Sequence, residues 1–544
     1  MRGCVLLSAS GRGVIAAKPE IFFSWLLLMI LLLLSPMAME SSSSSINEKL
    51  KTTADPLSSF SPDFLFGTSS SAYQFEGGYL AKERGQDIWD VYTHKQGNII
   101  DGSNGDVAND QYHRYKEDAD ILASLGVNSH KLSILWARIL PKGRHGKINW
   151  SGINYYKKVI NSLLRRGIQP FVTVNHYDLP QELQDKYQGW LSPKLREEYA
   201  YFAEVCFKYL GDGVKHWITF NEPNMWAFLT YRTGLWPPNH CTQPFNCTKG
   251  GPSELFIVGH NLILAHAAAV NIYKNKYQQA QGGQIGISVL YYWYEPLRNT
   301  SADKVAVERA LSFLSNWFLD PIIYGRYPKE MKDILGSDLP KFSRSDLKML
   351  NGAGVDFIGI NHYTTYYVQD CLSSHSHCER NGAGNFKIDG FVEQTPLKNG
   401  TLIGEMTGLY YLVVYPRGME KVIMYVKGRY PNTPLYVTEN GYCDITNSNS
   451  SMKEMLNDTK RVKFLKDYLG SVESAIRKGA DVRGYFIWSM LDNFEWGFGY
   501  TKHMGLYHVD RVTLKRTPKL SAKWYKKFIT KKVNVTTKRL YHSQ

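Results

Sequence analysis

Residues 217–223 read Trp-Ile-Thr-Phe-Asn-Glu-Pro, a short apolar run that ends in an acidic residue, Glu222. Residues 435–441 read Leu-Tyr-Val-Thr-Glu-Asn-Gly and place a second acidic residue, Glu439, after a similar run. Short runs that are rich in β-branched and aromatic residues predict strands. Each run therefore predicts a strand whose end holds a carboxylate on a rigid backbone.

Further apolar runs of this kind occur along the chain, and amphipathic helical patterns separate them, as at residues 196–210 and 461–478. With eight runs in all, the alternation predicts an α/β fold, a single (β/α)8 TIM barrel with long loop insertions. In such a barrel the carboxyl ends of the strands meet at one rim, where active sites lie. The further runs are residues 64–66, 131–134, 170–174, 285–289, 357–360 and 485–488.

Two carboxyl groups that face each other across a barrel mouth are equipped to cleave a glycosidic bond. One donates a proton to the departing oxygen while the other attacks the sugar carbon, and in retaining enzymes they lie about 5–5.5 Å apart. The simpler alternative is that these strands end in ordinary polar loops, but glutamate is a poor turn residue. We therefore predict that Glu222 and Glu439 share one site.

Five motifs carry a resemblance to a known family. They are residues 66–77 (Phe-Gly-Thr-Ser-Ser-Ser-Ala-Tyr-Gln-Phe-Glu-Gly), 176–181 (His-Tyr-Asp-Leu-Pro-Gln), 219–223, 436–441 and 488–496 (Trp-Ser-Met-Leu-Asp-Asn-Phe-Glu-Trp). With these motifs in family order, the chain resembles the plant β-glucosidases of glycoside hydrolase family 1 across residues 62–525. Its closest resemblance within the family is to the branch that cleaves monolignol glucosides such as coniferin and syringin.

The resemblance implies a retaining β-glucosidase that hydrolyses the β-O-glucosidic bond of a plant glucoside with an aromatic aglycone, through a covalent glucosyl-enzyme. It makes Glu222 the general acid/base and Glu439 the nucleophile. Burial and the ionised neighbour are expected to raise the pKa of Glu222. The positions that match substrate-binding residues of the family are Gln74, His176, Asn221, Tyr363, Trp488, Glu495, Trp496 and Met504.

Two positions depart from the family pattern. Lys131 stands where an arginine usually lies beneath the nucleophile, and lysine keeps the charge but loses the planar two-pronged donor. Met504 replaces an aromatic residue at the hydroxymethyl end of the sugar. From these two departures we expect slower glycosylation. Separately, on the aglycone side, Tyr177 stands where many relatives have tryptophan. Two alternatives stay open, a transglucosidase with the same catalytic pair and a catalytically weakened sugar-binding relative.

The N-terminal segment predicts export from the cell. Basic residues precede an apolar run that is short for a membrane span, so residues 1–38 read as a signal peptide, with a signal anchor as the alternative. Residues 39–61 form a flexible leader, 62–525 the barrel and 526–544 a basic C-terminal tail. No other apolar run is expected to span a membrane. We expect a secreted protein, extracellular or in the cell wall, with the vacuole as the alternative.

The seven cysteines fit a secreted protein better than a metal site,. Candidate disulfides that enclose short loops join Cys241 to Cys247 and Cys371 to Cys378, and Cys206 reads as a buried thiol. Several sequons are expected to carry glycans. They begin at Asn149, Asn246, Asn299, Asn399, Asn449, Asn457 and Asn534.

The chain carries 64 Lys and Arg residues against 49 Asp and Glu residues, a formal net charge of +15. Beside the small-molecule β-glucoside, a basic surface outside the cell favours anionic cell-wall polysaccharide as a partner. The basic residues are spread along the chain, which disfavours nucleic acid. No cofactor is predicted, because the sequence shows neither a metal-ligand spacing nor a glycine-rich phosphate loop. No motif specifies an oligomeric state.

Overall fold

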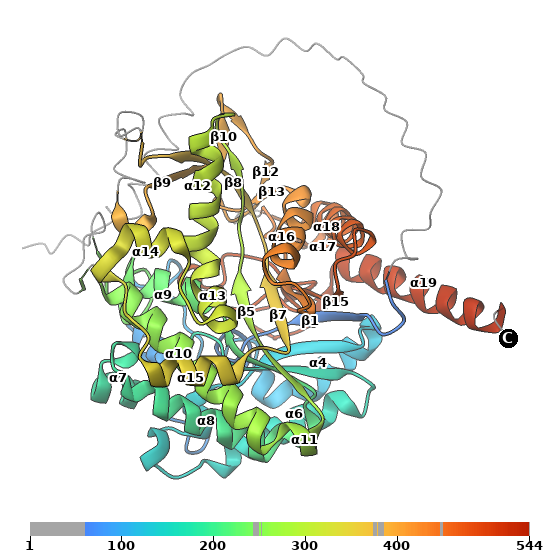
Figure 1. Ribbon diagram of the computed structural model, residues 1–544. Helices are drawn as coiled ribbons and strands as arrows, with labels where there is room; N and C mark the ends of the chain where they lie inside the picture. Colours follow the sequence, from blue (N-terminus) through green and yellow to red (C-terminus); the bar gives the residue numbers. More distant parts are fainter. Residues whose placement is uncertain are drawn as a thin grey trace, which may run out of the picture. The chain divides into compact units, whose positions relative to one another are not determined.

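The computed structural model describes residues 60–242, 250–251, 253–373, 378, 386–445 and 450–542, with side chains up to residue 531. Parallel strands close into an eight-stranded barrel, and helices surround it (Figure 1). The predicted TIM barrel is confirmed, since each of the eight apolar runs forms one of its strands. In order around the barrel they are β1 (Leu65–Ser69), β15 (Val482–Ile487), β14 (Leu435–Asn440), β7 (Phe357–Asn361), β5 (Gln284–Leu290), β4 (His216–Asn221), β3 (Gln169–Asn175) and β2 (Ser129–Ser133).

Amphipathic helices pack their apolar faces on the barrel. The two helices that the sequence predicts explicitly are α8 (Lys194–Leu210) and α18 (Thr459–Arg477). On α8 the buried residues Leu195, Tyr199 and Phe202 recur at helical spacing, which is how one face of a helix comes to be buried,. Other long helices are α4 (Gln111–Leu125), α6 (Trp150–Leu164), α10 (Glu254–Lys276), α15 (Arg344–Ala353), α16 (Pro416–Arg429) and α19 (Leu520–His542).

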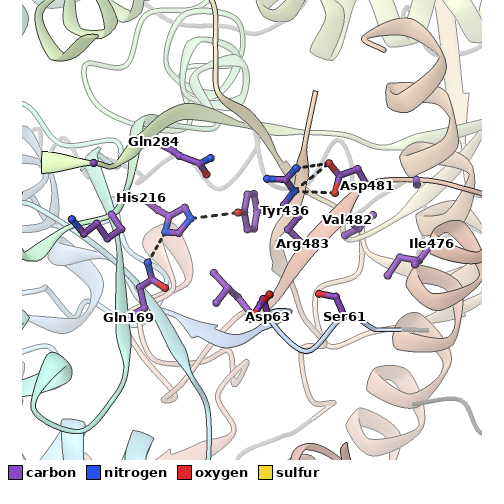
Figure 2. A pocket seen from close by; sticks show the side chains of 14 residues that line it. Ser61, Asp63, Gln169, His216, Gln284, Tyr436, Ile476, Asp481, Val482 and Arg483 are labelled. Atoms are coloured by element: carbon purple, nitrogen blue, oxygen red, sulfur yellow. Dashed lines mark hydrogen bonds and ion pairs between the residues drawn. The ribbon is translucent and has the colours of Figure 1, made fainter. Parts of the chain in front are cut away.

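Aromatic side chains fill the end of the barrel at which the strands begin. Phe171 contacts Phe357, Tyr436 and Phe486, with ring centroids 5.4, 5.2 and 5.0 Å away. A cavity of about 620 Å³ opens at this end, and Figure 2 shows its lining. Its polar groups pair with one another, as His216 does with Tyr436 at 3.4 Å. The cavity therefore lies at the opposite end of the strands from the rim that carries TIM-barrel active sites.

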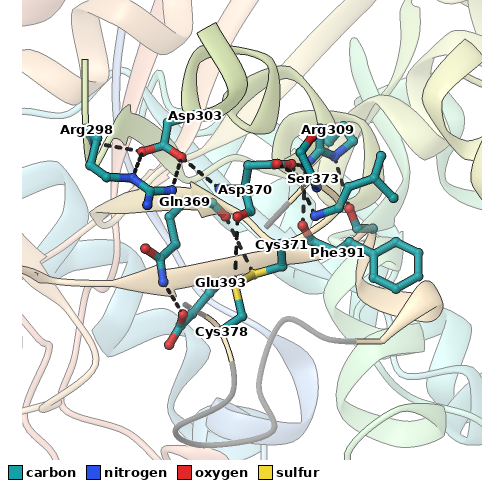
Figure 3. The surroundings of a disulfide bond; sticks show 12 residues. Arg298, Asp303, Arg309, Gln369, Asp370, Cys371, Ser373, Cys378, Phe391 and Glu393 are labelled. Carbon is teal, nitrogen blue, oxygen red and sulfur yellow. Dashed lines mark hydrogen bonds and ion pairs between the residues drawn. A yellow bond between two sulfur atoms is a disulfide. The ribbon is translucent and has the colours of Figure 1, made fainter. Parts of the chain in front are cut away.

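A disulfide closes the loop that follows one strand of a small sheet outside the barrel (Figure 3). Cys371 and Cys378 form it, which confirms this predicted pair. The strand end is also fixed by Asp370, which pairs with the buried Arg309 and whose N–H donates to Asp303 at 2.9 Å. The strands of this sheet are β6 (Trp293–Pro296), β8 (Thr365–Asp370) and β9 (Val392–Thr395).

The second predicted pair, Cys241 with Cys247, falls partly outside the described residues, which do not include Cys247. Cys206 and Cys443 are buried thiols, as predicted for Cys206. Burial raises the pKa of the Cys443 thiol to about 12 and that of Cys206 well above its usual value. Both thiols therefore stay protonated at neutral pH, which keeps them unreactive.

One predicted sequon lies in a helix cap. Asn149 is buried, and its side chain accepts hydrogen bonds from the N–H groups of Ser151 at 3.0 Å and Gly152 at 3.3 Å at the start of α6. Its Nδ2 donates to the Lys82 carbonyl at 3.2 Å. The cap uses Oδ1 and contributes about 1 kcal/mol to the stability of the helix. A glycan would attach to Nδ2, which is buried against the Lys82 carbonyl, so the side chain would have to leave its buried position to carry one.

We therefore expect glycopeptide mapping of the secreted protein to find Asn149 unmodified. Asn299 and Asn399, which are exposed, serve as the internal comparison and are expected to accept glycans. A glycan found at Asn149 of the folded protein would contradict the buried placement of this side chain. The motif is the same at all three positions, so the difference is one of accessibility.

The length and apolar composition of the helix α10 differ from the prediction that no further run of the sequence could span a membrane. Among the described residues it is long and apolar enough to cross a membrane, but 78% of its most apolar window is buried inside the protein. The side chains it buries include Leu262, Leu264 and Val270. The apolar composition of α10 thus serves packing within the barrel domain, where helices can be hydrophobic on most sides.

Buried charges connect the C-terminal helix to the rim of the barrel. Lys519, directly before α19, donates to Asp492 at 2.8 Å and to Asp444 at 3.1 Å. Arg461 of α18 also donates to Asp444, at 2.7 Å. Asp444 follows β14 and Asp492 follows β15, so this charge cluster ties both segments to the end of the chain. The helix α19 runs across the boundary predicted between barrel and tail.

Candidate active site

Glu222 lies where β4 passes into the short helix α9 (Pro223–Tyr231). Its φ of 42° is in the left-handed region, which is uncommon for a residue with a side chain,. Pro223 presets the first turn of α9, and the Glu222 N–H donates to the Ser288 carbonyl at 2.8 Å,. This sharp turn fixes the carboxyl group at the end of the strand, where the residue is 8% exposed.

Both carboxyl oxygens of Glu222 accept hydrogen bonds. Asn361 Nδ2 donates to Oε1 at 2.7 Å, and Tyr177 Oη donates to Oε2. Burial and the charge of Glu439 raise the pKa of Glu222 to about 7, although these two hydrogen bonds act in the opposite direction,. Glu222 can therefore hold a proton near neutral pH and release it, as a general acid/base must.

Glu439 lies at the end of β14 and is held from two sides. Lys131 of β2 donates to its Oε1 at 2.5 Å, and Tyr363 Oη donates to its Oε2 at 2.8 Å. Lys131 is fully buried, so water screens this ion pair little,. A cation and a phenol on the two oxygens form an arrangement that suits an ionised nucleophile.

Two asparagines link the glutamates. Asn221 Oδ1 accepts from Lys131 Nζ at 2.8 Å and from Asn361 Nδ2 at 3.1 Å. Because Lys131 also binds Glu439 and Asn361 also binds Glu222, one continuous hydrogen-bond network contains both carboxyl groups. The structure thus brings together the two acidic residues that the sequence places at separate strand ends.

His176 and Glu495, two predicted sugar contacts, lie next to this network. His176 Nε2 is 3.2 Å from Asn221 Nδ2, and burial together with Lys131 keeps the pKa of His176 well below its usual value. Burial and the charge of Glu439 raise the pKa of Glu495 to about 8. His176 Nδ1 and Glu495 Oε2 are buried without a hydrogen-bond partner among the described residues. Unpaired buried polar atoms are expected in a site that binds a hydroxyl-rich ligand.

Gln74 is engaged within the protein. Its Nε2 donates to Asn493 Oδ1 and to the Phe494 carbonyl, both at 2.9 Å, and its Oε1 accepts from Ser71 at 2.6 Å. Both amide hydrogens are thereby used, and Oε1 retains one lone pair. In this arrangement Gln74 can accept a hydrogen bond from a sugar hydroxyl but cannot donate one.

Trp488 and Trp496 belong to different apolar groups that meet at His176. The His176 ring is 5.8 Å from Trp488 and 6.0 Å from Trp496. Trp488 shares a small core with Met504, whereas Trp496 packs on Trp236 at 5.3 Å. Met504, which is buried beside Trp488, stands where the family resemblance places an aromatic residue at the hydroxymethyl end of the sugar.

The sequence alone did not identify Tyr177 and Asn361 as contacts of Glu222. Tyr177 follows β3 and Asn361 ends β7, both in polar segments that the barrel collects at its rim, and this position was the available signal,. The signal indicates that a side chain lies near the site but does not say which atom it meets.

Comparison with known proteins agrees with the family that the sequence motifs and this geometry indicate. The family model for Glycosyl hydrolase family 1 matches residues 57–534, most of the chain. The chain belongs to glycosyl hydrolase family 1. Similar family 1 members include a rice protein (Oryza sativa subsp. japonica) named probable inactive beta-glucosidase 14, which is 55% identical over 475 residues and covers 87% of this chain and 91% of the relative.

The coniferin beta-glucosidase of Pinus contorta is 48% identical over 480 residues, which cover 86% of this chain and 92% of the relative. Among solved family 1 structures, a mutant rice β-glucosidase in a covalent complex with Glc is 45% identical, with a TM-score of 0.82 and coverage of 86% of this chain and 98% of that chain. The expected family, fold and similarity to plant β-glucosidases are confirmed.

Lys131 offers a direct test of the departure from the family pattern. We expect Lys131→Arg to raise the rate of glycosylation by roughly three- to tenfold, because a guanidinium can donate to Asn221 and Glu439 through two coplanar N–H groups. Rapid-mixing kinetics with an activated aryl β-glucoside would measure that step. Lys215→Arg, at an exposed site directly before β4, is the matched control and should leave the rate of glycosylation unchanged. A rate at or below the parent's would contradict the expectation.

Proposed function

We propose that this family 1 protein is a retaining β-glucosidase that hydrolyses glucosides with an aromatic aglycone. The observation that carries the proposal is the network joining two buried carboxyl groups of different character. Glu222 can hold a proton near neutral pH, whereas Glu439 is paired with Lys131 at 2.5 Å. Retaining glycosidases need one protonated and one ionised carboxyl group at the scissile bond.

In the proposed mechanism Glu439 attacks the anomeric carbon while Glu222 gives its proton to the departing aglycone oxygen. The glucosyl ester that forms removes the charge of Glu439, and with it one cause of the raised pKa of Glu222. Glu222 then acts as a base on water, which releases glucose in the β configuration. The covalent complex of the rice relative with Glc supports an intermediate of this kind.

The proposed aglycone preference rests on aromatic side chains next to the acid/base. Tyr177, which bonds Glu222, has its ring 5.0 Å from Trp236 and 6.3 Å from Trp226. Flat apolar walls beside the leaving-group position suit an aromatic aglycone. Because the pine relative is named for coniferin, monolignol glucosides are the substrates that we propose.

A substrate panel tests this proposal. Purified protein would be given coniferin, syringin and 4-nitrophenyl β-glucoside, with proton NMR identifying the anomer of glucose that forms first. We expect β-glucose first and a higher kcat/KM for the two monolignol glucosides. α-Glucose as the first product would overturn the retaining mechanism, and no turnover of any substrate would favour the sugar-binding alternative. An excess of glucosylated alcohol over glucose after alcohol addition would identify a transglucosidase.

We also propose that the protein is secreted to the cell wall, where its basic surface binds anionic polysaccharide. The apolar N-terminal run supports export, and the disulfide between Cys371 and Cys378 fits an oxidising compartment,. Recovery of the protein from wall extracts, and its retention on a polygalacturonate column at low salt, would support the proposal. Retention inside the vacuole would contradict it.

A further inference from the structure

Tyr177 has a rigid setting next to the acid/base. Its backbone φ is 69°, in the left-handed region, and the residue is 3% exposed. Its ring contacts His176 at 4.9 Å, Trp236 at 5.0 Å and Trp496 at 5.4 Å. A side chain enclosed by packed aromatic rings has little freedom to change rotamer. The Tyr177 hydroxyl therefore occupies a fixed position against Glu222.

The two glutamates are held in parallel ways. Each accepts one hydrogen bond from a phenol, Tyr363 in the case of Glu439 and Tyr177 in the case of Glu222. The second donor to Glu439 is the cation Lys131, whereas the second donor to Glu222 is a neutral amide. Without a bonded cation, Glu222 depends more strongly on its phenol than Glu439 does.

Tyr177 acts as a donor over the whole working range of pH. Burial and the neighbouring Glu222 raise the pKa of the Tyr177 phenol well above its usual value, so the hydroxyl keeps its proton. A hydrogen bond donated to a carboxyl oxygen stabilises the ionised form of the acid. The phenol thus opposes burial and Glu439, both of which favour the protonated form of Glu222.

We propose that Tyr177 is a positioning residue that restrains Glu222 and sets the pH at which the acid/base gives up its proton. The inference rests on the proposed function, in which glycosylation needs Glu222 protonated and deglycosylation needs it ionised. By favouring the ionised form, the phenol shifts the balance between the two half-reactions toward the second. Other titratable or charged groups act on Glu222 through space, and they are Lys131, Glu439, Tyr292, Tyr363 and Glu495.

The Tyr177→Phe variant tests this role, because it removes the donor and keeps the aromatic ring. We expect the alkaline limb of kcat/KM to move upward by about one pH unit, the size of a hydrogen bond to a charged group. The value of kcat at the optimum should fall as the restraint on Glu222 is lost. Tyr292→Phe is the matched control, since Tyr292 acts on Glu222 through space but is not one of the two side chains that donate a hydrogen bond to it, and its alkaline limb should stay in place.

An unchanged limb in Tyr177→Phe, or an equal shift in Tyr292→Phe, would overturn the proposal. A second readout separates this outcome from failure of the proposed function. In protein labelled with carboxyl-13C glutamate, the resonance that disappears in Glu222→Gln reports the titration of Glu222 without any turnover. We expect this resonance to titrate at higher pH in Tyr177→Phe than in the parent, whether or not the parent hydrolyses a glucoside.

Discussion

The Glu439→Gln variant is expected to lose at least about four orders of magnitude in kcat/KM toward every glucoside that the parent cleaves, as is usual when a covalent nucleophile is removed. An amide cannot form the glucosyl ester. The amide oxygen can still accept from Lys131, and the amide NH2 can donate to the Tyr363 hydroxyl oxygen, so the fold should survive the change,. Steady-state assays with a sensitive fluorogenic β-glucoside would measure the loss.

A surface variant provides the control for this loss. Glu405 is exposed and pairs with Lys460 at 2.5 Å on the surface, so Glu405→Gln should leave both activity and melting temperature near the parent values,. Retention of more than about one hundredth of the activity by Glu439→Gln, with parent-like folding, would assign the nucleophile elsewhere. In Glu439→Gln, Glu222 should lose its proton at lower pH than in the parent, since the charge of Glu439 helps to raise the pKa of Glu222.

The Glu222→Gln variant is expected to lose more activity toward glucosides whose leaving group needs a proton than toward those whose leaving group does not. With a glucoside of a poorly acidic alcohol, glycosylation should slow by roughly 10²- to 10⁴-fold, the usual contribution of general acid catalysis. A dinitrophenyl glucoside needs little protonation to depart, so its first step should stay fast and the glucosyl-enzyme should accumulate. A burst of dinitrophenolate followed by slow turnover would be the signature, and mass spectrometry would detect the adduct.

The pH profile gives this variant a second test. In the parent, the rate of glycosylation should fall as pH rises through about 7, because Glu222 loses the proton that it must donate,. Glutamine does not titrate, so this alkaline limb should vanish in Glu222→Gln. A limb that persists would point to Glu495, whose pKa burial and Glu439 raise to about 8, as the group responsible.

The barrel could be predicted from sequence because its strands are short apolar runs and its rim residues follow them directly. The same regularity placed Glu222 and Glu439 at one rim, since it depends on backbone topology alone. The bond from Tyr177 to Glu222 could not be predicted in this way, because it depends on the path of a loop and on a left-handed backbone turn. Neither has a strong local signal in the sequence.

Two other features show where local patterns lose their meaning. The sequon at Asn149 is complete as a motif, but the fold uses that side chain to begin a helix. The Gln74 amide matches a sugar-binding position of the family, yet both of its hydrogens are taken up by the segment at Asn493 and Phe494. In both cases the deciding contact involves a neighbour that the motif itself does not contain.

The charge cluster around Lys519 makes the rim segment that carries Asp492 and Glu495 dependent on a residue next to the C-terminal helix. A stop codon ahead of Lys519 would remove the ammonium group that binds Asp492, which lies three residues before Glu495. Of the two cations that bind Asp444, only Arg461 would remain. Under the proposed function, such a truncation would lower the affinity for the glucoside, although it lies far along the chain from both catalytic glutamates. An affinity tag appended after the last residue leaves these ion pairs intact, whereas a truncation that removes Lys519 would break them.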